Sequence, residues 1–422
     1  MNLLRRLMFA VLVAPITFIG HVQAAVPESA WVLLPGTSRA VPDLPARRSF
    51  AIAAQAEILA RAPQQILLPM PWGAVSANTR DIELHAEDRF TWRGSLDAKG
   101  EYPVVLSVAG EAVAGFISAP EGIWEIVPGT AAGEAWLIEL DAAQLPECAG
   151  PVVVEPLQTA TGHAPGHGPA GSMVPLDSGE QIDVLLMYSP AARDAAGGVN
   201  QIRAQAQAAV TSGNSAFANS AMRARFRVVG IELLEDWVEG AESASVELSK
   251  FRANARMQAR RTALAADMAS LLVANLPNSC GIAYVMRNVS AGFAGNAVQI
   301  TDRDCAVGNL SWAHEHGHNM GFEHDPANGG SPSSVSYPWS FGHYVEGQGA
   351  QSFRTVMSYQ CPTGGCTRRP YFSNPRVNFN GFATGIVNAR DNARSGDGVA
   401  DTVANFRLSQ QWPGFADSFE QR

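Results

Sequence analysis

The chain has 422 residues, which is more than one hydrophobic core usually serves, so its length predicts two domains. Its 30 Lys and Arg residues are outnumbered by 39 Asp and Glu residues, and no basic run forms a stripe that could neutralise a phosphate backbone. The composition therefore argues against a nucleic-acid partner.

Residues 1–24 have the pattern of a signal peptide. Arg5 and Arg6 precede an apolar run over residues 7–19, and residues 22–24 suit cleavage by a signal peptidase after Ala24. A membrane anchor is the alternative, but the run is shorter than the ~20 residues that span a bilayer, and Pro15 interrupts it. We expect a secreted, extracellular protein, with the periplasm as the other destination, and no stable membrane insertion after cleavage.

Residues 25–157 contain short apolar stretches separated by glycine, proline and acidic residues. The stretches at residues 102–108, 114–117, 123–127 and 135–140 alternate in polarity, which predicts an antiparallel β meander. Residues 158–179 are rich in Gly, Pro, Ala, Ser and Thr. That composition predicts a flexible linker that is open to proteolytic processing.

Residues 180–408 have the pattern of an α/β domain, which a short C-terminal tail follows at residues 409–422. Apolar runs of strand length at residues 182–187, 226–234 and 281–286 alternate with helical periodicity over residues 202–217 and 264–272. Strands that alternate with helices predict a largely parallel sheet.

The most informative segment is HEHGHNMGFEHD at residues 314–325. His314 and His318 are four residues apart, so on a helix they project from one face and can bind one zinc ion. Glu315 lies beside the first ligand, where its carboxylate can act as general base. Gly321 can adopt a positive φ that ends the helix and returns His324 as the third ligand. His316 lies off the ligand face and is expected to face solvent.

This segment resembles the long zinc motif of the metzincin clan, and TVMSY at residues 355–359 resembles the methionine turn of that clan. The resemblance implies that Met357 forms a hydrophobic floor below the metal, although an ordinary core methionine would be buried in the same way. Asp325 resembles the acid that braces this turn in the reprolysin branch. Tyr359 resembles the oxyanion-stabilising tyrosine of astacins and serralysins, with a purely structural hydroxyl as the alternative.

The pattern as a whole is most similar to bacterial reprolysin-like enzymes of the peptidyl-Asp metalloendopeptidase type, over residues 180–408. The resemblance implies a mixed α/β (α+β) fold: a mostly parallel twisted sheet with an active-site helix, preceded by a β-rich propeptide. It also implies an antiparallel edge strand at about residues 291–301 that would pair with protein or peptide substrates. Arg368 and Arg369 follow the methionine turn, where a guanidinium could bind a substrate aspartate; two solvated surface arginines are the alternative.

Five cysteines in an exported chain leave at least one unpaired. Cys361 and Cys366 enclose a short glycine-containing loop that a disulfide could close, which would leave Cys280 and Cys305 as a second pair. Four cysteines allow three pairings, and the sequence does not choose among them. Cys148 precedes the linker and resembles the cysteine switch of matrix metalloproteases, whose thiolate occupies the fourth position of the zinc; a free bystander thiol is the alternative.

Together these features predict a secreted zinc-dependent endopeptidase made as a zymogen, with its own propeptide as intramolecular inhibitor and a preference for cleavage before Asp. Two other functions fit part of the pattern. A zinc-binding scaffold or adhesin without protease activity would normally have lost Glu315, which is present. A zinc hydrolase that acts on non-peptide amides would differ only in its substrate.

Overall fold

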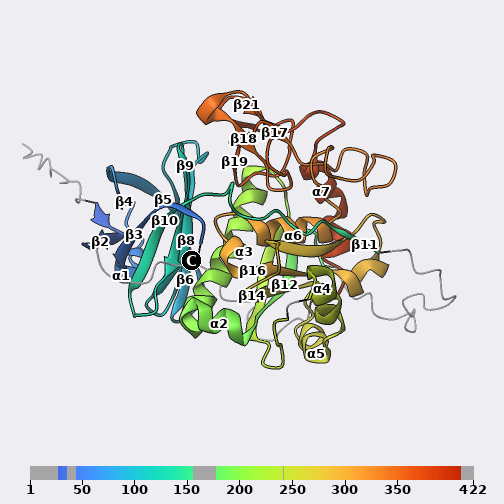
Figure 1. Cartoon of the computed structure of the whole chain (residues 1–422), viewed down its shortest axis with the longest axis horizontal. Coiled ribbons are helices and arrows are strands. Elements are labelled where there is room, and N and C mark those ends of the chain that lie inside the picture. Colours follow the sequence, from blue (N-terminus) through green and yellow to red (C-terminus); the bar gives the residue numbers. More distant parts are fainter. Residues whose placement is uncertain (1–26, 36–43, 155–176, 241, 410–422) are drawn as a thin grey trace, which may run out of the picture.

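The computed structural model describes residues 27–35, 44–154, 177–240 and 242–409. We call residues 27–140 the N-terminal unit, residues 141–154 the connecting segment and residues 177–409 the C-terminal unit; the two units lie side by side (Figure 1). The predicted signal peptide and most of the predicted linker lie outside the described residues.

A ten-stranded sheet forms the N-terminal unit. Each strand from β4 to β10 pairs antiparallel with the next one, so the meander expected in this part of the chain is present. These strands are β4 (Gln65–Met70), β5 (Gly73–Ala86), β6 (Arg89–Ser95), β7 (Pro103–Ala109), β8 (Ala112–Ala119), β9 (Gly122–Pro128) and β10 (Glu134–Leu140). The other elements are β1 (Glu28–Ser29), β2 (Trp31–Leu33), β3 (Ala46–Ala54), which pairs with β10, and α1 (Ala56–Ala60).

The middle strands of this sheet are buried on both faces. Alternate side chains such as Trp92, Leu106 and Trp124 pack in the core of the N-terminal unit, whereas Val105 and Phe116 point to the other face and join the core of the C-terminal unit. Because side chains alternate between the two faces of a strand, both faces must be apolar here. The sheet therefore serves as one wall of the larger core.

The C-terminal unit contains a six-stranded sheet in the order β11-β15-β16-β14-β12-β13. Its strands are β11 (Val152–Val153) from the connecting segment, β12 (Gln181–Tyr188), β13 (Arg225–Leu233), β14 (Met268–Val273), β15 (Gly281–Val285) and β16 (Val298–Asp302). Strands β13, β12, β14 and β16 are parallel, and β15 is antiparallel to β16. The predicted mixed α/β class with a mostly parallel sheet is thus confirmed.

Helices connect and cover this sheet. They are α2 (Pro190–Ala196), α3 (Val199–Asn219), α4 (Ala244–Ala253), α5 (Ala255–Ala263), α6 (Ser311–Asn319) and α7 (Asn392–Val403), with short 3₁₀ turns η1 (Ala291–Asn296), η2 (Arg303–Cys305) and η3 (Gly349–Gln351). Between α6 and α7 lie the short strands β17 (Tyr344–Val345), β18 (Phe353–Arg354), β19 (Thr367–Arg368), β20 (Asn378–Phe379) and β21 (Phe382–Ala383). Helix α3 packs against β7 and β8 on one side and against β13 and α6 on the other, so it joins the two units (Figure 1).

Two expectations about the elements were wrong. The apolar residues from Met268 onward form the buried strand β14 and not a helix. A short, fully buried apolar run fits the helical and the strand pattern equally well, so the sequence pattern alone does not distinguish them. The expected edge strand at residues 291–301 is instead η1 followed by β16, which lies inside the sheet between β14 and β15. The antiparallel strand is β15, and it pairs on its outer side with β11 alone.

Glu125 of β9 is a buried acid at the contact between the units. Its Oε2 accepts the backbone N–H of Gly308 at 3.0 Å. The pKa of Glu125 is raised to about 8, chiefly by burial and also by the nearby Asp304, whereas the Gly308 N–H and Arg303 oppose the rise. The contact between the units therefore favours the protonated acid.

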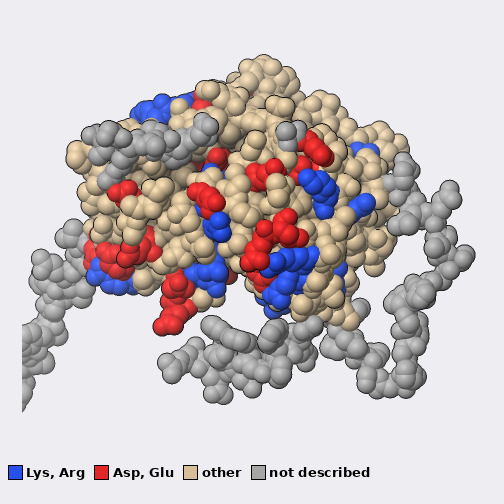
Figure 2. Space-filling model, turned by 60° about the horizontal axis from the view of Figure 1, so that its bottom comes forward, with Lys and Arg blue, Asp and Glu red and all other residues tan. Residues whose placement is uncertain are grey.

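Charged side chains of both signs lie next to one another on the face that Figure 2 shows.

Within the described ranges, no helix combines the length and the apolar character needed to cross a membrane.

Candidate metal centre

Three imidazole rings meet beside α6. His314 and His318 are one helical turn apart and project from the same face of this helix. The chain leaves α6 through Gly321, whose φ is +78°, and a Cβ at this position would lie 2.7 Å from the carbonyl oxygen of Met286. The turn returns His324, whose Nε2 lies 3.1 Å from Nε2 of His314 and 3.1 Å from Nε2 of His318.

The backbone fixes the orientation of each ring. The outer nitrogen Nδ1 lies within hydrogen-bond distance of a carbonyl oxygen in all three cases: His314 to Val356 at 2.8 Å, His318 to Phe322 at 2.8 Å and His324 to Asn328 at 3.2 Å. An Nδ1–H that donates to a carbonyl leaves Nε2 as an unprotonated acceptor.

The three rings form a donor set for a metal ion. Burial lowers the pKa of His318 to about 4 and the pKa values of His314 and His324 well below their usual range, so all three rings are neutral. Three unprotonated nitrogens that face one another cannot satisfy one another by hydrogen bonding. A cation between them can, and three convergent imidazoles are the ligand set of many catalytic zinc sites.

Cys148 of the connecting segment completes a group of four potential ligands. Its Sγ lies 3.1 Å from Nε2 of His324, and one ligand atom from each of Cys148, His314, His318 and His324 falls within 4.8 Å of the others. Burial raises the pKa of the Cys148 thiol well above its ordinary value, and the nearby Glu315 raises it further. A thiolate here is therefore favoured only when a cation neutralises it.

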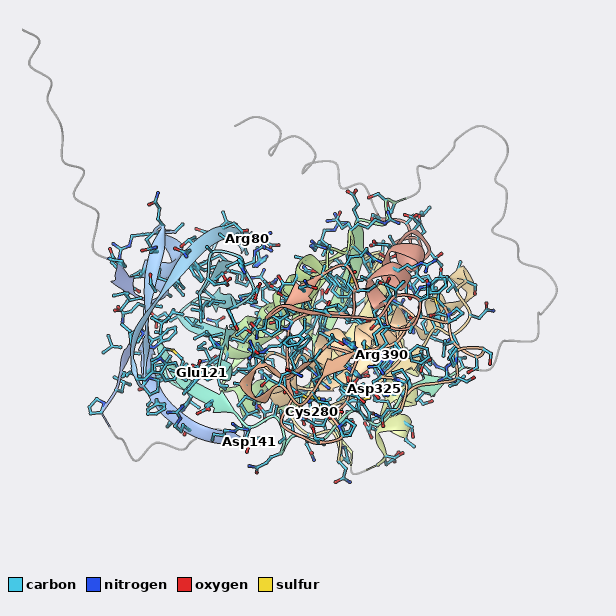
Figure 3. All side chains as sticks on the ribbon, turned by 90° about the horizontal axis from the view of Figure 1, so that it is seen from above. Arg80, Glu121, Asp141, Cys280, Asp325 and Arg390 are labelled. Carbon is cyan, nitrogen blue, oxygen red and sulfur yellow. A yellow bond between two sulfur atoms is a disulfide. The ribbon has the colours of Figure 1, made fainter. Side chains whose placement is uncertain are left out.

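The connecting segment lies along the edge of the six-stranded sheet. The Ala149 N–H donates to the carbonyl of Gly281 at 2.9 Å, and the Cys280 N–H donates to the carbonyl of Glu147 at 3.3 Å. Farther along, β11 pairs with β15 in parallel. The segment begins at Asp141 and reaches the strand that follows Cys280; both residues are labelled in Figure 3.

Glu315 is an unusual buried acid. It is fully buried, and within the described part of the chain neither carboxylate oxygen has a hydrogen-bond partner. Burial raises the pKa of Glu315 well above its ordinary value, while Arg368 opposes the rise. Gly281 makes room for this carboxylate, because a Cβ there would lie 2.5 Å from Oε1 of Glu315. An unpartnered buried carboxylate costs free energy, and it is typical of a group that exchanges protons during a reaction.

The methionine turn lies against α6. Met357 is fully buried, and a Cβ at Gly317 would lie 2.5 Å from its Sδ, so helix and turn are in close contact. Asp325 accepts the N–H of Tyr359 at 3.1 Å and the hydroxyl of Ser358 at 3.5 Å. The acid after the third histidine thus connects the ligand loop to the turn.

The Tyr359 hydroxyl lies at the same centre. It is 3.1 Å from Sγ of Cys148 and donates to the carbonyl oxygen of Cys148 at 3.0 Å. The Tyr359 and His324 rings have their centroids 4.1 Å apart. Burial raises the pKa of Tyr359 above its ordinary value, and Cys148 adds to the rise, so this hydroxyl keeps its proton and acts as a donor.

Two buried arginines lie next to this centre. Arg354 of β18 and Arg368 of β19 stand opposite each other in a parallel strand pair, and both bind the carboxylate of Glu147, at 2.7 Å and 3.0 Å. Arg369 points away: its Nη1 donates to the Ala119 carbonyl at 2.7 Å, in the N-terminal unit. Consequently the structure brings Arg368 to the site but not Arg369, and neither is a solvated surface arginine.

His316 is also placed differently from the expectation. It is fully buried, with ring centroids 4.4 Å from Trp312 and 5.4 Å from Phe226. The face of α6 opposite the metal ligands packs against the core and not against solvent, because α3 and the sheet enclose this helix.

Of the three possible pairings, the structure has Cys280–Cys305 and Cys361–Cys366, with Cα–Cα distances of 5.5 Å and 5.8 Å. The first ties the start of β15 to η2, and the second closes a loop after the methionine turn. Cys148 is the free cysteine of the described residues.

Sequence reasoning missed three residues of this site. Glu147 is adjacent to the cysteine, and Arg354 directly precedes the methionine turn, so adjacency to known motifs was the available signal. Gly281 gave none, because its role depends on a carboxylate 34 residues away in the chain.

Comparison with protein families gives an independent view of the C-terminal unit. Residues 178–373 match Metallo-peptidase family M12 (Reprolysin_5). The chain is 32% identical over 231 residues to a peptidyl-Asp metalloendopeptidase of Stenotrophomonas maltophilia strain R551-3, covering 54% of this chain and 52% of that protein. It is 31% identical over 249 residues to a peptidyl-Asp metalloendopeptidase of Pseudomonas aeruginosa, covering 54% and 40%. The chain therefore matches about half the length or less of these relatives, and the expected resemblance to reprolysin-like metalloendopeptidases is confirmed.

Solved structures are similar at a lower level. A chaperone–substrate complex aligns with a TM-score of 0.43 and 21% identity, over 54% of this chain and 39% of that chain. Metalloproteinase-II from Bacteroides fragilis aligns with a TM-score of 0.41 and 9% identity, over 70% of this chain and 91% of that chain.

Proposed function

We propose that this chain, whose residues 178–373 match a reprolysin-like metallopeptidase family, is the latent precursor of a secreted zinc-dependent endopeptidase. One observation carries the proposal. Nε2 of His324 lies 3.1 Å from Nε2 of both His314 and His318, and the buried carboxylate of Glu315 beside them has no hydrogen-bond partner within the described residues.

His314, His318 and His324 would hold the zinc ion, and their carbonyl-bound Nδ1 atoms keep the rings in place. Bound zinc would polarise the carbonyl of the scissile peptide and make an attacking water more acidic. Met357 and Asp325 would support the site from below, one by packing and the other by tying the ligand loop to the turn.

Glu315 is the proposed general base, because a bound cation beside it would favour the ionised carboxylate that burial alone disfavours. Its carboxylate takes a proton from the attacking water and delivers it to the leaving amine nitrogen, so the carboxylate is regenerated when the peptide bond breaks. Tyr359 is the proposed oxyanion donor, because its hydroxyl already donates to a peptide carbonyl, that of Cys148. A preformed donor of this kind needs no reorganisation as charge develops on the carbonyl oxygen.

Latency would come from the connecting segment. Its Cys148 thiol lies 3.1 Å from Nε2 of His324, from where it would take the fourth ligand position, and β11 pairs with the outer edge of β15. An extended substrate needs the same edge for backbone pairing, so the segment excludes substrate and water together. Proteolysis within residues 158–179 would separate the segment from the C-terminal unit and permit its release.

Export and cleavage preference complete the proposal. The signal-peptide pattern of residues 1–24 and the two disulfides are both consistent with an oxidising, extracellular location. The curated relatives are named for cleavage at peptidyl-Asp bonds, and we propose the same preference, for bonds that precede Asp, in this chain.

The test is to digest a denatured protein with the processed enzyme and to map the released peptides by mass spectrometry, with and without a zinc chelator. We expect chelator-sensitive internal cuts that concentrate before Asp, and no cuts by the Glu315→Gln variant prepared in parallel. A zinc-loaded, segment-free protein that makes no cut would overturn the proposal in favour of a catalytically idle zinc-binding scaffold. Hydrolysis of small amides alone would indicate a non-peptide hydrolase.

A further inference from the structure

Two arginines beside the metal centre are buried in a way that requires an explanation. Arg354 and Arg368 are 1% and 3% exposed, and they are direct neighbours across the β18–β19 pair. The pKa of Arg354 is lowered to about 9, chiefly by burial and also by the adjacent Arg368. Two like charges at a buried position destabilise the fold unless an anion lies between them.

The anion in this structure is Glu147. One carboxylate oxygen is 2.7 Å from Nη1 of Arg354 and accepts the N–H of Gln360 at 3.1 Å, and the other is 3.0 Å from Nη2 of Arg368. The carboxylate thus accepts three hydrogen bonds, two of them from guanidinium groups. This arrangement of donors favours a negatively charged carboxylate over a neutral side chain. The donors belong to the C-terminal unit, and the acid belongs to the connecting segment.

The position of this pocket relates it to bond cleavage. Arg354 and Arg368 both also donate to the carbonyl of Ser358, at 3.1 Å and 3.4 Å. Ser358 lies between Met357 and Tyr359 in the turn below the metal centre. Glu147 itself is one residue from Cys148, whose thiol faces His324. A residue whose side chain fills this pocket is therefore directly adjacent in its chain to the residue that lies at the metal centre, as Glu147 is to Cys148.

We propose that Arg354 and Arg368, together with the N–H of Gln360, form the pocket that recognises an acidic side chain flanking the scissile bond, and that Glu147 occupies it in the precursor. The inference rests on the proposed peptidase function and assigns its specificity to particular residues. Glu147 mimics the substrate acid, so the segment is held by two anchors, a thiol at the metal centre and a carboxylate in the pocket. Arg369 has no part in recognition, since its guanidinium binds the backbone of residues 119 and 120.

A second reading makes Glu147 only a counter-ion that stabilises the precursor, with the arginines serving to hold the methionine turn through Ser358. That reading gives the processed enzyme no preference for an acid. The two readings therefore differ in substrate selectivity, which activity on a single substrate does not reveal.

The experiment uses enzyme processed from the full-length chain and a matched set of peptides that differ only at one position beside the scissile bond: Asp, Glu, Asn, Gln or norleucine. With the unmodified enzyme we expect kcat/KM to be at least tenfold higher for Asp or Glu than for the isosteric amides. In Arg368→Gln and Arg354→Gln the ratio of Asp to Asn should fall by about tenfold or more, to a value near one. The matched control, Arg369→Gln, should keep the ratio of the unmodified enzyme.

Each outcome distinguishes the inference from the function on which it rests. If the unmodified enzyme cleaves none of the peptides, the proposed function fails. If it cleaves Asp and Asn peptides equally, or if both arginine variants keep the Asp to Asn ratio, only the pocket assignment is overturned. The comparison of Asp with Asn in the unmodified enzyme needs no variant, so a variant that fails to fold does not leave the inference untested.

Discussion

Replacing Glu147 by Gln should weaken latency in the uncut precursor. The substitution keeps the shape of the side chain but removes the negative charge that binds Arg354 and Arg368. A hydrogen bond to a charged group contributes about 1.5–3 kcal/mol, so two such bonds give an upper value of about 3–6 kcal/mol. The Glu147 side chain is 25% exposed, and its solvent contact reduces this value. We take about 3 kcal/mol, which corresponds to a change of about 100-fold in the ratio of open to closed precursor.

The assay measures hydrolysis of a fluorogenic peptide by full-length protein that intact mass spectrometry shows to be uncut. We expect residual activity about 100-fold above that of the unmodified precursor, with Cys148→Ala as the reference for a precursor that has lost its thiol anchor. Glu139→Gln is the matched control, because the carboxylate of Glu139 pairs with Arg48 inside the N-terminal unit. The uncut Glu147→Gln precursor could instead be no more active than Glu139→Gln while Cys148→Ala is active. In that case the Glu147 carboxylate does not hold the connecting segment in place.

Three further results are expected. Cys148→Ala should give an uncut precursor that is active, and a precursor that stays latent in the same peptide assay would exclude the thiol switch. Gly281→Ala should lower kcat at least 100-fold with zinc content unchanged, because the new Cβ displaces Glu315, which lies 2.5 Å from that position; metal analysis beside kinetics separates this from loss of zinc. After processing, the N-terminal unit should separate more readily as pH rises from about 4.5 to 8. In this range Glu125 is ionised when the units are apart but must take up a proton when the interface buries it, so a higher pH disfavours association. Co-elution in gel filtration at pH 5 and pH 8 measures this, and Glu125→Gln should remove the pH dependence.

Much of the metal centre could be predicted from sequence because it is encoded locally. His314, Glu315 and His318 occupy one turn of α6, and the glycine that ends the helix fixes where His324 returns. Helical periodicity and the conformational freedom of glycine are sufficient to place these groups, and neither depends on distant parts of the chain.

The pocket next to the metal could not be derived in this way. Arg368 and Arg369 are consecutive, and consecutive residues of an extended chain point to opposite sides, so one reaches the site and the other the N-terminal unit. The second arginine of the pocket, Arg354, comes from a strand whose pairing with β19 has no local signature. Its anion, Glu147, comes from a segment more than 200 residues earlier.

The solvent-facing expectation for His316 failed for a related reason. Helical periodicity states which face a residue occupies, but not what covers that face. Helix α3, whose packing joins the two units, encloses α6 opposite the metal ligands, so the histidine is buried.

Zinc K-edge X-ray absorption on the precursor and on the processed protein tests most directly whether Cys148 is a ligand at the metal centre. We expect one sulfur and three nitrogen ligands at the zinc of the precursor, and loss of the sulfur, with the three nitrogens retained, after processing. A precursor whose zinc has no sulfur ligand, or a processed protein that keeps one, would contradict the central claim that Cys148 closes this metal centre until the connecting segment is released.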